Sequence, residues 1–162
     1  MNKYVEKYQK IVNQLIKKSF PELKVKKIFI YELPFSSRFY SAGAWNFKIF
    51  AIITLFKNSR KYSDEMLKAL LAHELSHLEN HEKKAYIEDF IYFLKWLFSS
   101  KTRADEERKA DILTIKKGYG KQYILLTNKI YEKDKKKLEH HKIRGYLSPE
   151  QIKSYMKKLK WF

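Results

Sequence analysis

The spacing of apolar residues changes along the first third of the chain. Within residues 3–18 they recur every three or four positions, which predicts an amphipathic helix that ends before Pro21. Residues 24–32 are rich in β-branched and aromatic side chains, as strands usually are. The segments 37–47 and 48–56 keep that composition without a helical period, so we expect two further strands joined by a tight turn.

Helical spacing returns after residue 60 and continues along the rest of the chain. Ser63 is suited to cap a long helix, because Asp64 and Glu65 follow it in the first turn and leucines then form a stripe. We expect further helices over residues 85–98, from Thr102 as N-cap to Gly118, over 122–133, and from a capping box at Ser148–Gln151 onward. A helix, three strands and then only helices indicate an α+β fold, in a single domain spanning residues 1–162.

The net charge of +17 adds possible partners to this picture. A basic surface can bind nucleic acid or anionic lipid. The alternative is that the lysines form an ordinary solvated surface. The composition favours this alternative, because only five of the 35 basic residues are arginine and sequence-specific nucleic-acid readers rely on arginine. Both interpretations therefore stay open: weak binding to nucleic acid or anionic lipid, and a solvated surface without a partner.

Cysteine is absent, which excludes disulfides and thiolate metal sites. The opening residues lack the apolar core of a signal peptide. The most apolar run, Phe90–Phe98, is interrupted by Lys95 and is too short to span a bilayer. We therefore expect a cytoplasmic protein without a transmembrane segment, while the oligomeric state stays open.

The long helix carries an H-E-x-x-H motif formed by His73, Glu74 and His77. Histidines four residues apart project from one face and can bind a single zinc ion, with the glutamate beside the open coordination position. The alternative is a pair of histidines whose hydrogen bonds are satisfied within a helix without metal. His81 is the next residue of the same ladder, but it lies roughly 12 Å along the axis from His73, so we expect it outside the coordination sphere.

A candidate third ligand follows on the next helix. Glu107 and Asp111 are also four residues apart, so Glu107 could complete a His₂Glu site while Asp111 hydrogen-bonds a ligand histidine. The alternative for Glu107 is an exposed carboxylate near the helix start, like its neighbours Asp105 and Glu106.

The H-E-x-x-H motif followed by E-x-x-A-D at residues 107–111 resembles the gluzincin metallopeptidases, in particular the membrane-embedded heat-shock and CAAX-processing type and the small soluble archaeal minigluzincins. The segment AGAWNFKIFAIITL also resembles the strand pair before the active-site helix in minigluzincins and SprT-like proteins. The resemblance implies a zincin-like fold, Zn²⁺ bound by His73, His77 and Glu107, and peptide-bond hydrolysis through a zinc-bound water with Glu74 as general base. The chain departs from the membrane-embedded relatives in lacking transmembrane helices, and from SprT-like proteins in offering a glutamate for their third histidine.

Peptidases of this class add a tyrosine or histidine that stabilises the oxyanion. The candidates are His140 or His141, with Tyr119 and Tyr146 behind them, and none has a diagnostic spacing. Minigluzincins can be self-inhibited by their terminal segments, which implies that the residues after Asp111 could occlude the cleft and leave the activity latent.

Two segments near the motif allow alternative roles. An extended peptide or protein substrate could add to the edge of the strand over Lys48–Leu55, unless this is a buried central strand. We expect the aromatic segment 86–98 to pack in the core, with a lid over the cleft or a surface facing lipid as alternatives.

Three functions remain at this point. A zinc-dependent peptidase is the hypothesis that the motifs favour. The alternatives are a non-catalytic interaction module with a structural zinc ion and a nucleic-acid-associated basic protein.

Overall fold

The computed structural model describes residues 2–47, 49–82, 86–131 and 135–159. The helices and strands are α1 (Lys3–Ser19), β1 (Lys27–Leu33), β2 (Ala42–Asn46), β3 (Phe50–Phe56), α2 (Asp64–Glu82), α3 (Tyr86–Phe98), α4 (Ser100–Thr114), α5 (Gly120–Tyr131), α6 (Lys135–Arg144) and α7 (Pro149–Lys158). This order confirms the α+β prediction. The helix α6 was not expected, and residues 85 and 132–133 of two expected helices lie outside the described residues.

The strands form one sheet in the order β1-β3-β2. β3 pairs in parallel with β1, where Lys27 faces Phe50, and antiparallel with β2, where Ala42 faces Leu55. The prediction of a free edge at Lys48–Leu55 is therefore wrong for its described residues 49–55, because both edges of β3 are already hydrogen-bonded. The edge strand on this side is β2.

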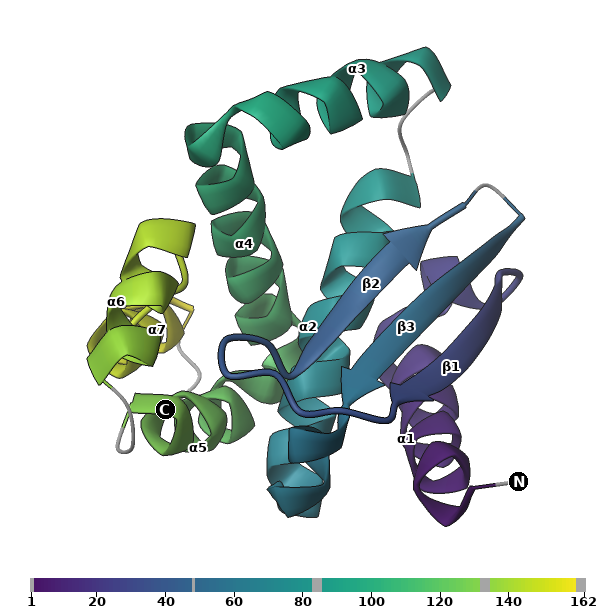
Figure 1. Cartoon of the computed structure of the whole chain (residues 1–162), viewed down its shortest axis with the longest axis horizontal. Coiled ribbons are helices and arrows are strands. Elements are labelled where there is room, and N and C mark those ends of the chain that lie inside the picture. The colour runs from purple at the N-terminus through teal and green to yellow at the C-terminus, as the bar shows by residue number, and fades with distance from the viewer. Residues whose placement is uncertain (1, 48, 83–85, 132–134, 160–162) are drawn as a thin grey trace.

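Helices cover one face of the sheet, with α1 and α2 behind it and α4 and α5 beside α2 (Figure 1). The apolar face of α1 is buried as its spacing predicts, and alternate residues of β3 point into the same core. α2 is buried along most of its length, from Leu67 to Leu78. Because α2 lies at the centre, the polar residues of its H-E-x-x-H motif are largely withdrawn from water.

The helix ends follow the expected capping chemistry with one exception. Ser63 accepts a hydrogen bond from the backbone N–H of Met66 at 3.3 Å and begins α2. The cap of α4 is Ser99, whose hydroxyl accepts from the N–H of Thr102 at 3.1 Å, so the expectation that Thr102 is the N-cap is wrong. A single non-helical residue separates α3 from α4, which leaves Thr102 inside the first turn.

The remaining two boundaries agree with the sequence. Gly118 has a φ of 95° inside the π-helical turn Ile115–Tyr119, and this conformation ends α4 and redirects the chain into α5. Ser148 and Gln151 form the expected capping box at the start of α7.

The expectation that residues 86–98 pack in the core is wrong for the described side chains of α3. Ile87, Ile91 and Phe98 are 64%, 46% and 86% exposed. The physical reason is position: α3 crosses one end of the molecule, beyond α2 and α4, and does not lie over the sheet (Figure 1). Within the described ranges, no helix combines the length and apolar character needed to cross a membrane.

Candidate metal centre

α2 and α4 bring the three proposed ligands together. His73 Nε2 lies 3.1 Å from His77 Nε2, and Glu107 Oε2 lies 3.3 Å from each of these nitrogens. The two histidines occupy one face of α2 because they are four residues apart. Glu107 faces them from α4, so two helices that are separate in sequence form one triangle of nitrogen and oxygen donors.

The size of this triangle fits a zinc ion. Zinc binds imidazole nitrogen and carboxylate oxygen at about 2.0–2.1 Å, and tetrahedral geometry then separates neighbouring ligand atoms by roughly 3.3–3.4 Å. The three observed separations lie close to that value. Glu107 Oε2 is buried, and its ion-pair contacts at 3.3 Å are the two histidine nitrogens themselves, so a cation at the centre of the triangle would contact all three atoms.

Close packing of small residues sets the approach of α4 to α2. Ala110 on α4 is fully buried, and Ser76 on α2 and Thr114 on α4 place their hydroxyl oxygens 3.1 Å apart. Each hydroxyl also donates to a carbonyl of its own helix, so neither leaves an unpaired polar group. The alanine of the E-x-x-A-D motif therefore has a packing role: it lets the two ligand helices come close.

Asp111 holds the ring of His73 from behind. Its carboxylate lies 3.0 Å from His73 Nδ1, accepts a short hydrogen bond from the Tyr123 hydroxyl, and accepts the backbone N–H of Leu147 at 2.7 Å. An Nδ1–H that donates to Asp111 leaves Nε2 as the free electron pair that faces His77 and Glu107. The position expected for Asp111 is thus the one observed.

The charges of the cluster compensate one another. Burial lowers the pKa of His73, but the bonds to Asp111 and Glu107 outweigh it and raise that pKa to about 9. Burial raises the pKa of Glu107, but the charge of His77 dominates and holds it far below its usual range. This attraction favours protonated histidines, and a divalent cation at the same point would displace the proton on Nε2 while Nδ1–H of His73 remains on Asp111.

Glu74 lies at the wall of a small cavity beside the cluster. It is 5% exposed, and burial raises its pKa above the ordinary value for a carboxyl, which makes it a stronger base than an exposed glutamate. The cavity has a volume of about 40 Å³. Its lining comes from the chain before β2, from α2 and α5, and from the segment between α5 and α7, and includes Tyr40, His73, Glu74, Tyr123, His141 and Tyr146.

The sequence reasoning missed Glu106. Its Oε1 lies 2.6 Å from His81 Nε2 and 3.5 Å from His77 Nδ1, so it supports His77 much as Asp111 supports His73. Burial raises the pKa of Glu106, but the bonds to His77 and His81 lower it to about 2. The expectation of an exposed carboxylate is wrong for Glu106, and His81 lies outside the triangle as expected.

The oxyanion candidates differ in their distance from the cluster. The ring of Tyr146 lies 5.8 Å from that of His73, and the His141 ring packs against Tyr146 at 4.4 Å and lines the same cavity. His140 packs instead against Phe39, at 4.7 Å between ring centroids. Tyr119 is remote from the cluster, because its hydroxyl bonds to Ser19 at the end of α1.

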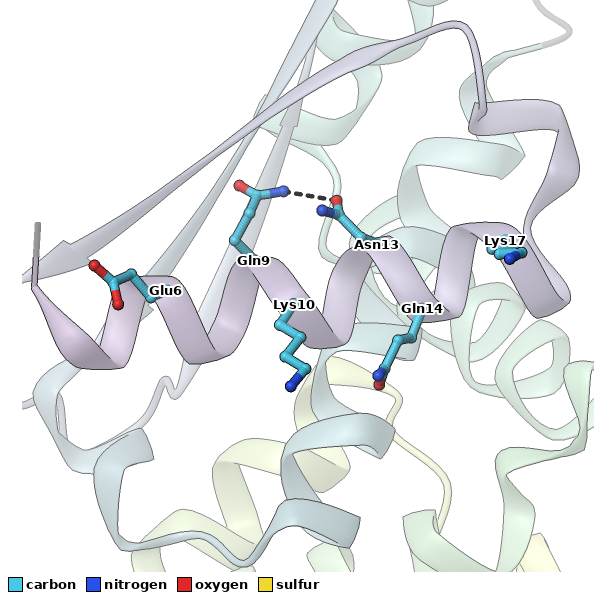
Figure 2. A pocket seen from close by; sticks show the side chains of 6 residues that line it. All are labelled: Glu6, Gln9, Lys10, Asn13, Gln14 and Lys17. Carbon is cyan, nitrogen blue, oxygen red and sulfur yellow. Dashed lines mark hydrogen bonds between the residues drawn. The ribbon is translucent and has the colours of Figure 1, made fainter.

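A second hollow, of about 440 Å³, lies along the exposed side of α1. Figure 2 shows that the polar side chains around it, from Glu6 to Lys17, all come from this one helix. With no second wall and no cluster of catalytic groups, it offers a ligand little enclosure.

Comparisons of the chain with family models, curated proteins and solved structures found no match.

Proposed function

We propose that this protein is a zinc-dependent peptidase of the gluzincin type with a zincin-like fold. The observation that carries the proposal is the triangle of His73, His77 and Glu107 donor atoms with the buried carboxyl of Glu74 next to it in sequence. Structural zinc sites are usually closed by four protein ligands, whereas catalytic sites keep one position open. Within the described part of the chain the cluster has three members, which favours a catalytic over a structural zinc ion.

A zinc ion held by the three side chains would lower the pKa of a water molecule and polarise a peptide carbonyl. Glu74 would accept a proton from that water and pass it to the leaving amine, for which its raised pKa is suited. Asp111 keeps His73 in the tautomer that presents Nε2. Each group of the cluster therefore has a role in the hydrolysis of a peptide bond.

Tyr146 is the oxyanion donor that we favour, with His141 behind it. Burial, and after it the charge of Glu107, raises the pKa of Tyr146 well above the usual value, so its hydroxyl keeps its proton and can donate. The ring of His141 packs against that of Tyr146, with 4.4 Å between the centroids. Gly145, with a φ of 85°, turns the chain at the end of α6 so that Tyr146 faces the cluster.

The structure also supports latency. Ligand sites commonly enclose several hundred Å³, and the cavity beside Glu74 has about 40 Å³, enough for a few water molecules only. α6 closes it from one side: His140 packs on Phe39, and Arg144 Nη2 donates to the Tyr40 hydroxyl at 3.1 Å. A peptide could enter only after this contact between α6 and residues 39–40 opens.

Replacing Arg144 with alanine should raise the rate of peptide hydrolysis. The variant loses one hydrogen bond that holds the closed form, with a net value of about 1 kcal/mol, so the open fraction should rise about fivefold. We expect kcat/KM for a fluorogenic peptide to rise by a similar factor. The matched control is Lys142→Ala, which removes an exposed charge from the same helix and should leave the rate unchanged. Equal rates in all three proteins would show that this contact does not limit access.

The proposal is tested by metal analysis and peptide cleavage on the same preparation. After dialysis the protein should hold about one zinc per chain by mass spectrometry of the metal. Cleavage of an unfolded protein substrate should stop with a chelator and return with added zinc. A protein that binds no zinc at equimolar metal would refute the proposal, whatever its activity.

A further inference from the structure

Five of the described apolar side chains of α3 are exposed to solvent. The residues of this α3 surface are Ile87 (64% exposed), Ile91 (46%), Leu94 (40%), Leu97 (43%) and Phe98 (86%). Ile87, Ile91, Leu94 and Phe98 follow a spacing of four, three and four residues, so they form one stripe along the helix. A stripe of this length on a protein that is otherwise rich in charge indicates an interaction site.

A second group of exposed apolar residues lies toward the same end of the molecule. Trp45 near the end of β2, and Phe47 and Ile49 just beyond it, are 55%, 45% and 81% exposed. Figure 1 shows the adjoining ends of β2 and β3 toward the same end of the molecule as α3, away from α5 and α7. Tryptophan and phenylalanine are the side chains that proteins place in the interfacial region of a bilayer.

The charge of the protein selects between possible partners. The net charge is +17; Lys95 on α3 is exposed next to Leu94 of the stripe, Lys101 is exposed at the start of α4, and an exposed acidic residue, Glu88, follows Ile87 on α3. Basic residues next to an apolar helix face complement the anionic headgroups and the hydrocarbon boundary of one surface. Nucleic acid would interact with the basic residues but would leave the aliphatic side chains of the stripe exposed to water.

We propose that α3, together with Trp45, Phe47 and Ile49, docks on the surface of an anionic lipid bilayer. The stripe would enter the headgroup boundary while the lysines remain among the headgroups. Tyr92, on another face of α3, packs its ring 5.2 Å from His81 on α2, so the docked helix stays joined to the helix of the metal cluster. This inference is independent of catalysis, because it requires neither zinc nor hydrolysis.

The test is sedimentation of the full chain with vesicles of phosphatidylcholine, with and without phosphatidylglycerol. Binding should require phosphatidylglycerol, weaken with added salt, and shift the tryptophan emission to shorter wavelength. The double variant Ile91→Ser/Leu94→Ser should lower the partition coefficient more than tenfold. The matched control is Ile143→Ser on α6, which alters an equally aliphatic residue that is 71% exposed, and should bind as the original protein does.

Three results would overturn the proposal. One is no binding to vesicles that contain phosphatidylglycerol, and another is unchanged binding by a double variant whose circular dichroism and thermal midpoint match the original. The third is a dimer, measured by sedimentation velocity, that the double variant abolishes while vesicles bind neither protein, since a second copy would then cover the surface. Preferential binding of single-stranded RNA over vesicles at equal salt would also count against lipid.

Discussion

Glu107→Ala protein should emerge from dialysis without zinc, whereas the original chain retains about one ion. Glu107 supplies one of three donors and the carboxylate charge that lies 3.3 Å from both histidine nitrogens. Groups that only support a metal ligand typically contribute about ten- to a hundredfold in affinity, so loss of a ligand itself should lower zinc affinity at least about a hundredfold. Metal content by mass spectrometry and affinity by competition with a chromogenic chelator would measure the loss.

Two neighbours of Glu107 provide graded controls on the same helix. Asp105→Ala removes an exposed carboxylate and should leave zinc affinity unchanged. Glu106→Gln alters the group that supports His77 and His81, and supporting groups of this kind typically contribute about ten- to a hundredfold in affinity. Full zinc retention by Glu107→Ala would contradict the ligand assignment, and equal losses in all three variants would indicate a general effect of acidic charge.

The sequence predicted the two residue pairs of the site that lie within one helix each, because these pairs depend on local helix geometry alone. Residues four apart on a helix share a face, so the pairing of His73 with His77 and of Glu107 with Asp111 follows from spacing. The triangle itself was expected only through the resemblance of two short motifs. Spacing does not state how far α4 is rotated about its axis, and for this reason Glu106, one residue from Glu107, was missed although it faces His77.

The residues around Glu74 depend on contacts between distant segments. Tyr123 reaches the cluster from α5, and Tyr146 from the turn before α7, with no spacing relative to the motif that would reveal either. The sequence placed His140 or His141 ahead of the two tyrosines as oxyanion donor without a diagnostic spacing, whereas Tyr146 is the candidate whose ring lies 5.8 Å from that of His73. The rings of His141 and Tyr146 lie near the cluster because the chain reverses at Gly145, a glycine whose positive φ no pattern predicts.

The fold shows the same limit. Periodicity predicted α1 and α2 well, because one apolar face identifies an amphipathic helix. α3 is apolar on several faces, and its pattern therefore could not distinguish a buried helix from one that faces solvent or lipid. β3 likewise has apolar side chains at most positions. Its place at the centre of the sheet depends on parallel pairing with β1, and this contact cannot be read from the sequence because β2 lies between the two strands in the chain.

Glu74→Gln should lose peptide hydrolysis while the zinc site and the fold remain. The amide has the shape of the carboxyl but cannot accept the proton of the attacking water, and general base catalysis is typically worth about 10²- to 10⁴-fold. We expect kcat/KM to fall by a factor of about a thousand. The measurement belongs in both the original and the Arg144→Ala backgrounds, so that a closed cleft cannot conceal the loss.

The stability of the same variant separates a catalytic role from a structural one. Burial raises the pKa of Glu74, so its ionised form is less favourable in the folded chain than in the unfolded chain. This cost is absent below the unfolded pKa and grows as the pH rises above it. A neutral glutamine avoids it, and the thermal midpoint of Glu74→Gln at pH 8 should therefore equal or exceed that of the original protein. A fall in the midpoint together with loss of zinc would instead assign Glu74 to the structure of the site, and retained hydrolysis would remove it as the general base.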